Sequence, residues 1–364
     1  MTMQDLPLGF TEKVTFQLRS LYNRHGYSRY KMNKFEEYDL YARNKDFLIS
    51  DSVITFTDLN GKLMALKPDV TLSIVRSSRD DGKTLQKLYY NENVYRAAKG
   101  TRTFRELMQV GLEALGPIDE YCIAEVLTLA AESLRLISRD SILNLSHLGI
   151  LNRAIDQAGL PDNRKARALS CIGEKNIHEL TQLCSSCGIP EQKAARLLSL
   201  ATLCGNAQEV LPRLRALVPG CPEVGQLARI TGALAEEVKA MLRLDFSAVD
   251  DIHYYNGIVF KGFIQGLPGS VLSGGQYDNL MKKMHRKSGA IGFAVYMDML
   301  QQLDTAKRSV DADCLLCYGP GDALADIRAA AEILRQAGES VLVQPGIPEN
   351  LRFRRITTPG EVLG

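Results

Sequence analysis

One predicted strand of this chain carries a polar face that could bind a small ligand. The segment RELMQVGLEALG (105–116) alternates as a β-strand does, and residues two apart on a strand face the same side. Gln109, Gly111 and Glu113 then share one face, and the apolar side chains between them share the other. An amide, a gap and a carboxylate in a row would line a small polar pocket. A half-exposed strand with a solvated outer face fits the same pattern.

Tyrosines occur in a second strand-like segment, HYYNGIVF, which begins at His253. Alternation would place His253 and Tyr255 on one face and Tyr254 and Asn256 on the other. Tyrosine hydroxyls near a carboxylate suit the recognition of a ligand that has ring nitrogens or an amine. The structural alternative is a pair of aromatic residues that simply favour strands.

Two further segments allow both a binding and a structural interpretation. In KPDVT, Asp69 and Thr71 are two residues apart and could contact a ligand, but both residue types also favour a helix N-terminus. In LSGGQYDNL, the glycine pair Gly274-Gly275 permits a close approach of the backbone to another group, and a tight turn explains it equally.

The eight cysteines do not by themselves indicate a metal site. Cys314 and Cys317 lie in a strand-like segment, where residues three apart face opposite sides, so we expect core residues. Cys184 and Cys187 lie at a helix end. A zinc or redox role there would need a second pair or a thioredoxin-like context, and we therefore expect no metal and no cofactor.

Composition is typical of a globular protein of two or three domains. The chain has 364 residues, of which 45% are hydrophobic and 24% charged, and its formal net charge is +2. No apolar run approaches the roughly 20 residues that span a bilayer, and the first ten residues have no signal-peptide pattern. We expect a cytoplasmic protein with reduced thiols, and the balanced charge gives no general argument for nucleic-acid binding.

The predicted elements place the polar segments in a sheet. A helix is predicted over 11–25, a hairpin over 53–66 with Asn60-Gly61 at its turn, and strands over 85–97, 105–116 and 141–147. A helix over 119–137 would be capped by Asp119. Residues from about 150 to 245 have helical periodicity and predict an all-helical insertion of perhaps six helices.

Strand patterns return after this block. We predict strands over 252–263 and 268–273, a helix-like segment over 292–303, and a βαβ tail formed by 312–318, 322–337 and 340–344. The last twenty residues read as short of a further complete unit. The fold class is therefore α+β: an antiparallel sheet with flanking helices, a helical insertion and a truncated α/β tail. The domain limits would be 1–148 with 246–307, 149–245, and 308–364.

The order of these segments resembles the catalytic domain of histidyl-tRNA synthetase, a class II synthetase. The resemblance covers about residues 7 to 303, and the helical block falls where that family has its insertion domain. It is carried by KPDVT, VYRAAKGTRTFRELMQVGLE, YYNGIVF, SGGQYDNL and GAIGFAVYMDML. The QxGxE and YYxxxVF elements are specific to the histidine branch of the class, and the tail is similar to the start of the anticodon-binding domain.

The residues that this resemblance assigns to ATP chemistry are missing. Arg96 remains from the Arg-x-Glu of the second class motif, but the Glu position holds Ala98. The arginine before the tyrosine pair is Asp250, and the arginine of the third motif is Met299, with Tyr296 in place of a glycine. A cation that stabilises charge in the transition state has thus become an anion, which is hard to reconcile with adenylate formation.

The amino-acid side of the resembled site is retained. Asp69 stands for the family's Glu and would hold a histidine α-amino group together with Thr71 and Gln109, while Glu113 and the tyrosine pair would hold the imidazole. Arg96 or Arg105 could contact the α-carboxylate. We therefore assign six residues to histidine binding: Asp69, Thr71, Gln109, Glu113, Tyr254 and Tyr255.

A chain that retains the histidine pocket but lacks the ATP site resembles the regulatory subunits of ATP phosphoribosyltransferase. These subunits are paralogues of the synthetase. The resemblance implies no catalysis, a role in histidine biosynthesis and its feedback by histidine, and homodimerisation through the first class motif. It also implies a hetero-octamer of four and four with the short-form catalytic subunit, without tRNA or membrane partners. An active synthetase, or an amino-acid-binding paralogue with another role, is the alternative.

Overall fold

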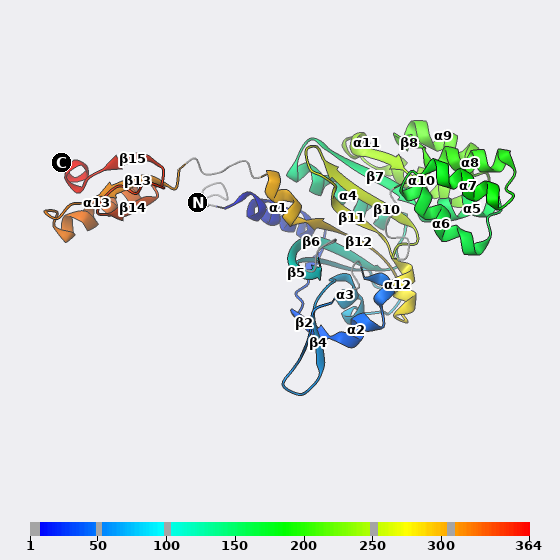
Figure 1. The fold of residues 1–364 in the computed structure, drawn as a ribbon, viewed down its shortest axis with the longest axis horizontal. Coiled ribbons are helices and arrows are strands. Elements are labelled where there is room, and N and C mark those ends of the chain that lie inside the picture. Colours follow the sequence, from blue (N-terminus) through cyan, green and yellow to red (C-terminus); the bar gives the residue numbers. More distant parts are fainter. Residues whose placement is uncertain (1–7, 49–52, 98–102, 248–253, 304–309) are drawn as a thin grey trace. The chain divides into compact units, whose positions relative to one another are not determined.

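The structure is a computed structural model that describes residues 8–48, 53–97, 103–247, 254–303 and 310–364. The chain forms two compact units, residues 1–302 and residues 303–364. The first unit contains a large sheet with its helices and the helical block, and the second is a small α/β unit (Figure 1).

Within the described residues, the main sheet of the first unit has nine strands in the order β1-β5-β6-β12-β11-β10-β7-β9-β8. Most neighbours are antiparallel, and the β1/β5 and β7/β9 pairs are parallel. This confirms the predicted α+β class and the strands predicted over 85–97, 105–116 and 141–147. The bounds are Ser28–Arg29 (β1), Gln86–Ala97 (β5), Phe104–Gly116 (β6), Ser141–His147 (β7), Cys204–Gly205 (β8), Leu242–Asp245 (β9), Ile258–Ile264 (β10), Ser270–Gln276 (β11) and Gly289–Tyr296 (β12).

Helices α1 (Phe10–Arg24) and α4 (Glu120–Ile137) pack together and against the strands of this sheet. Both were predicted from their apolar periodicity, and Asp119 caps α4 as expected by accepting a hydrogen bond of 2.8 Å from the Cys122 amide. The Tyr22 hydroxyl of α1 lies 3.0 Å from the Ser133 hydroxyl of α4. These helices cover the apolar side of β6, because the Tyr22 ring packs edge-on against Phe293 of the neighbouring strand β12.

A second sheet, in the order β2-β4-β3, contains the predicted hairpin. The hairpin turn is held by Asp58, whose carboxylate accepts hydrogen bonds from the Asn60 and Lys62 amides. Gly61 has a φ of +79°, which explains a glycine after Asn60. The elements around this sheet are Phe35–Glu37 (β2), Tyr38–Ala42 (α2), Lys45–Phe47 (η1, a 3₁₀ helix), Thr55–Thr57 (β3), Leu63–Leu66 (β4) and Thr71–Ser77 (α3).

The block after β7 has more helices than predicted and is not wholly helical. Seven helices replace the expected six, and β8 and β9 join the main sheet, β9 next to β7. Residues 242–245, LRLD, were missed because four residues are too few to establish a period. The domain limits predicted from the sequence, 1–148 with 246–307, 149–245 and 308–364, stay a prediction. The helices are Leu148–Ala158 (α5), Asp162–Gly173 (α6), Ile177–Ser186 (α7), Glu191–Ala201 (α8), Ala207–Leu217 (α9), Pro222–Ala233 (α10) and Glu236–Met241 (α11).

Two predictions after residue 250 were wrong. The strand expected from residue 252 begins only at Ile258, so strand alternation does not orient Tyr254 and Tyr255; His253 lies outside the described residues. The helix-like segment over 292–303 is strand β12 followed by a 3₁₀ helix, η2 (Met297–Leu303). The short helix α12 (Asp278–Lys283) precedes β12. β12 lies between β6 and β11 in mid-sheet, and such a strand is an apolar run that resembles a buried helix.

The second unit confirms the predicted βαβ pattern. Strands β13 (Ala312–Cys317) and β14 (Val341–Gln344) are parallel and joined by α13 (Leu324–Gln336). The last twenty residues add more than expected: β15 (Phe353–Thr357) pairs in parallel with β13, and the short helix α14 (Pro359–Leu363) follows.

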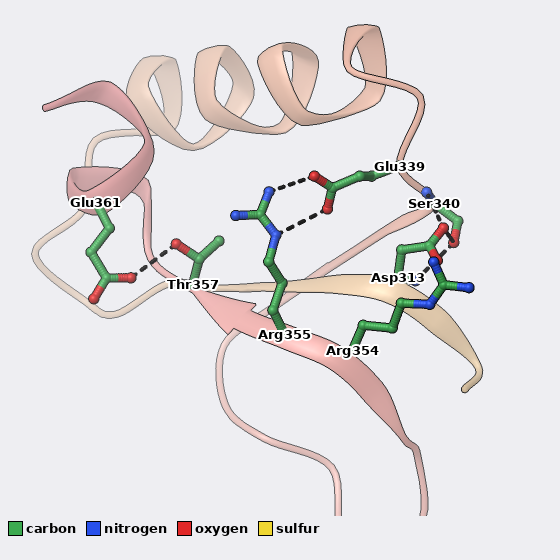
Figure 2. A network of polar contacts seen from close by, with 7 residues as sticks. All are labelled: Asp313, Glu339, Ser340, Arg354, Arg355, Thr357 and Glu361. Atoms are coloured by element: carbon green, nitrogen blue, oxygen red, sulfur yellow. Dashed lines mark hydrogen bonds and ion pairs between the residues drawn. The ribbon is translucent and has the colours of Figure 1, made fainter. Parts of the chain in front are cut away.

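Ion pairs tie the edges of this unit together (Figure 2). Arg355 of β15 donates to both carboxylate oxygens of Glu339, at 3.1 and 2.5 Å, and Arg354 lies 3.3 Å from Asp313. Asp313 in turn accepts a hydrogen bond of 2.8 Å from the Ser340 hydroxyl. Such surface pairs contribute little each, so the buried Cys314, Leu316 and Leu334 form the stabilising core.

A candidate amino-acid-binding cavity

A cavity of about 170 Å³ opens on the polar face of the main sheet, the side of β6 opposite the α1 and α4 helices. It is bounded by β5, β6, β11, β12, the start of α3 and the segment before β10. Seven of the eight sequence-predicted residues line it: Asp69, Thr71, Arg96, Gln109, Glu113, Tyr254 and Tyr255. The eighth, Arg105, is exposed on β6 and is not among the lining residues.

Glu113 lies at the buried end of the cavity, with 2% of its surface exposed. Its Oε1 accepts a hydrogen bond of 2.7 Å from the Thr71 hydroxyl, and its Oε2 accepts one of 2.6 Å from the Tyr277 hydroxyl. Both faces of β6 are buried at this level, so a half-exposed strand with a solvated outer face is excluded. A carboxyl group without water needs such partners, because burial of an unpaired polar group is costly.

Burial raises the pKa of the Glu113 carboxyl to about 8, against the two hydrogen bonds, which lower it. The nearby Asp69 carboxyl raises it further. At neutral pH the Glu113 carboxyl is therefore mainly protonated.

Asp69 and Arg96 form the other polar end. Asp69 accepts a hydrogen bond of 2.9 Å from the Leu72 amide at the start of α3, so the helix N-terminus and the cavity use the same side chain. Arg96 Nη2 lies 3.7 Å from Asp69 Oδ2, while its Nε donates to the Pro68 carbonyl at 2.7 Å. Burial raises the pKa of Asp69, and the Arg96 guanidinium opposes that rise.

Three tyrosines form an aromatic wall beside Glu113. The ring centroids of Tyr254 and Tyr255 are 4.9 Å apart, and those of Tyr254 and Tyr277 are 5.7 Å apart. Both residues of the pair thus line the cavity, although strand alternation predicted opposite faces. The irregular backbone before β10 permits this.

Glycines on neighbouring strands make room for these side chains. Gly292 of β12 is opposite Glu113, and a Cβ there would overlap Glu113 Oε2 and the Leu112 carbonyl oxygen. A Cβ on Gly275 would lie 2.7 Å from the Tyr255 ring. Because Gly275 lies within β11, the glycine pair serves close approach and is not a tight turn.

Sequence reasoning missed Tyr277. It follows β11 in the segment SGGQYDNL, where only the glycines were considered, and its side chain is fully buried next to Glu113. A tyrosine two residues after a glycine pair that permits close approach was the available signal.

The positions that the synthetase resemblance assigns to ATP are only partly described. Ala98 and Asp250 lie outside the described residues. Met299 lies in η2, and Tyr296 lines the cavity opposite Gln109 of β6. On the same face of β12, the lining residues change from Gly292 and Ala294 to Tyr296, which narrows the cavity at that end.

The described residues contain no group of three or more His, Cys, Asp or Glu side chains that could hold a metal ion. Cys184 and Cys314 are buried, Cys187 and Cys317 are partly buried, and all four are free thiols. Among the described helices, none is long and apolar enough to cross a membrane.

The chain is similar to known proteins over most of its length. The family model for histidyl-tRNA synthetase matches residues 9–300. The chain is 27% identical over 351 residues to an ATP phosphoribosyltransferase regulatory subunit from Oceanobacillus iheyensis, covering 93% of this chain and 86% of that protein. It is 32% identical over 294 residues to one from Cupriavidus pinatubonensis, covering 78% and 74%.

Two solved structures share the fold. One is an ATP phosphoribosyltransferase regulatory subunit/histidyl-tRNA synthetase from Bacillus halodurans, with a TM-score of 0.80, 24% identity and coverage of 96% of this chain and 93% of that one. The other is the HisG:HisZ complex of ATP phosphoribosyltransferase from Thermotoga maritima, with a TM-score of 0.62, 17% identity and coverage of 79% and 97%. The chain therefore belongs to the family of ATP phosphoribosyltransferase regulatory subunits, the non-catalytic relatives of histidyl-tRNA synthetase.

Proposed function

We propose that this subunit binds free histidine in the cavity and transmits its presence to a catalytic subunit in histidine biosynthesis. The observation that carries the proposal is the arrangement of the lining side chains. A buried carboxyl with a tyrosine wall lies at one end, and a carboxylate beside a guanidinium lies at the other. Histidine has the complementary groups: a ring with N–H donors, an ammonium and a carboxylate.

In this binding mode the imidazole ring occupies the Glu113 end. Glu113 accepts a ring N–H, and Tyr254 and Tyr255 contact the ring. The ammonium group binds Asp69, with Thr71 and Gln109 beside it. The α-carboxylate faces Arg96, the cation that lines the cavity, rather than Arg105. Arg96 lies 3.7 Å from Asp69, so each charge of a zwitterion can face a lining group of the opposite sign.

The partner is the short-form catalytic subunit of ATP phosphoribosyltransferase, in a hetero-octamer of four and four. The Thermotoga maritima structure is a HisG:HisZ complex of ATP phosphoribosyltransferase, and this chain belongs to the regulatory-subunit family. We expect that adding the purified chain to a short-form catalytic subunit raises its turnover, with a plateau at equimolar subunits. Steady-state rates and light-scattering mass test this. An unchanged rate together with separate elution of the two proteins would contradict the proposed function.

The chain is also expected to form no histidyl-adenylate. Asp250, Ala98 and Met299 replace the residues that would stabilise the charge of that reaction in the resembled synthetase. Histidine-dependent exchange of pyrophosphate into ATP should stay at the background of a no-enzyme control, with an active histidyl-tRNA synthetase as the positive control. Measurable exchange by the pure chain would support the synthetase alternative.

Homodimerisation is expected to use helix α1 and the strand after it, the first class motif of the resembled family. Asn33 stands where that motif has a proline. Phe16, on α1, is 42% exposed and is a candidate contact. Light scattering should give twice the monomer mass of 40.3 kDa, and Phe16→Glu should lower the dimer fraction. A monomer at all concentrations, with and without the partner, is the contrary result.

A further inference from the structure

In the described part of the chain, the hydrogen-bond partners of the Glu113 carboxyl are both hydroxyl groups, from Thr71 and Tyr277. A hydroxyl can donate to a carboxylate, and it can also rotate and accept from a carboxylic acid. A lysine, arginine or backbone N–H in the same place could only donate and would favour the anion alone. The Glu113 carboxyl is therefore held in one position by groups that tolerate both of its protonation states.

The surroundings of this carboxyl favour zero net charge. Among the described residues that line the cavity, Arg96 is the one with a basic side chain, and it is directed to Asp69 and to the Pro68 carbonyl. Other described titratable groups that interact with Glu113 are acidic or phenolic, and they come from the segment between α1 and β1, from the loop before α3, from β5, from the segment before β10 and from the residue after β11. They are Asp69, Tyr27, Tyr90, Tyr254 and Tyr277.

An isolated anion in this place would meet a large desolvation cost, whereas a carboxylate beside a cation would be compensated. A bound imidazole is a base that can become that cation, and its ordinary pKa of about 6.5 lies below the value of about 8 for Glu113. The difference disfavours transfer between separated groups, but the attraction within a buried pair acts in its favour.

We propose that Thr71 and Tyr277 are positioning residues that let Glu113 pass its proton to the ring of bound histidine, so that the ligand is held as an imidazolium against a carboxylate. The inference rests on the proposed histidine site. In the step, the O–H bond of Glu113 breaks and an N–H bond forms on the ring nitrogen that faces it. Two neutral groups become an anion and a cation, the net charge of the buried site stays at zero, and no other reactant is needed.

The ligand class follows from this step. Another ligand could have a side chain of similar shape that cannot accept a proton, such as a neutral amide. Glu113 would then stay protonated, and no charged pair would form. The site should therefore select a basic aromatic ring over an amide side chain by more than shape alone, because hydrogen bonds between charged partners are the stronger ones.

Nitrogen-15 NMR of ring-labelled histidine bound to the whole chain at pH 7.5 tests the proposal. Free histidine is then about nine-tenths neutral at its ring, as follows from a pKa of about 6.5. We expect both ring nitrogens of the bound ligand to have the chemical shifts of an imidazolium. Bound histidine with the shifts of a neutral tautomer would overturn the inference and leave the histidine site intact. Absence of binding in calorimetry would overturn the proposed site itself.

Two variants separate proton transfer from simple contact. Glu113→Gln keeps the shape but has no proton to give, so any bound ring should be neutral and binding should weaken about tenfold or more. Tyr277→Phe removes only the hydroxyl; since a lost donor disfavours the carboxylate, the bound ring should shift toward neutral and binding should also weaken about tenfold.

The control is Tyr41→Phe. Tyr41 is also fully buried, but it is not among the cavity-lining residues. Its affinity and ring signals should match the wild type. A Tyr277→Phe protein with wild-type ring signals and affinity would remove Tyr277 from the positioning role.

Discussion

Histidine affinity is expected to fall about 10- to 150-fold when Glu113 is replaced by Ala, which is the range of 1.5–3 kcal/mol for a hydrogen bond that involves a charged group. The change removes the acceptor for the ring N–H at the buried end of the cavity. It leaves the Thr71 and Tyr277 hydroxyls in place, but both lose their acceptor. Calorimetry on the purified chain, alone and with the catalytic subunit, measures the effect.

Gln109→Ala serves as a second probe at the opposite end of the polar face. It should weaken binding less than Glu113→Ala, because a neutral amide makes weaker hydrogen bonds than a charged group. Thermal unfolding of both variants controls for loss of the fold. Unchanged histidine affinity in both variants would place the effector site elsewhere and would show that this cavity does not bind histidine.

The assembled complex adds a check on the size of the coupling. If histidine inhibits the complex, substrate binding to the catalytic subunit must change the histidine affinity of this subunit by the same factor, because coupling between two sites is reciprocal. Histidine titrations with and without substrate measure that factor.

Gly292→Ala is expected to lower the free energy of unfolding by roughly 1–3 kcal/mol and to remove most histidine binding. The new methyl group would overlap both the Glu113 carboxylate and the Leu112 carbonyl oxygen. The side chain could swing away, but the carbonyl belongs to the neighbouring strand of a nine-stranded sheet and cannot move alone. Urea unfolding and calorimetry measure the two effects.

Gly232→Ala is the matched control. Gly232 lies in helix α10, and a Cβ there would meet no atom within 4 Å. The same chemical change should therefore stabilise the protein by about 0.5–1 kcal/mol, since alanine is favoured over glycine in helices, and histidine binding should be unchanged. A Gly292→Ala protein as stable as the wild type would show that the strands can separate at this point.

The elements with a clear period and the residues of the polar face could be predicted from local patterns in the sequence. Helices α1 and α4, the hairpin and strands β5 and β6 followed from local patterns, because helices and strands impose periods of 3.6 and 2.0 on their own side chains. Gln109 and Glu113 were paired for the same reason. The order of the family motifs carried the resemblance to the synthetase. The loss of the ATP residues beside the retained histidine residues carried the assignment to the regulatory subunits.

The tertiary structure alone decided what joins segments that are distant in the sequence. Tyr277 contacts Glu113 across 164 positions, and Gly292 makes the space for that carboxylate from another strand. Arg96 lines the cavity while Arg105, its cross-strand neighbour on β6, stays exposed. Strand β12 could not be told from a helix by its sequence, because burial on both faces erases the alternation. Such contacts depend on strand order and register, which no local period encodes.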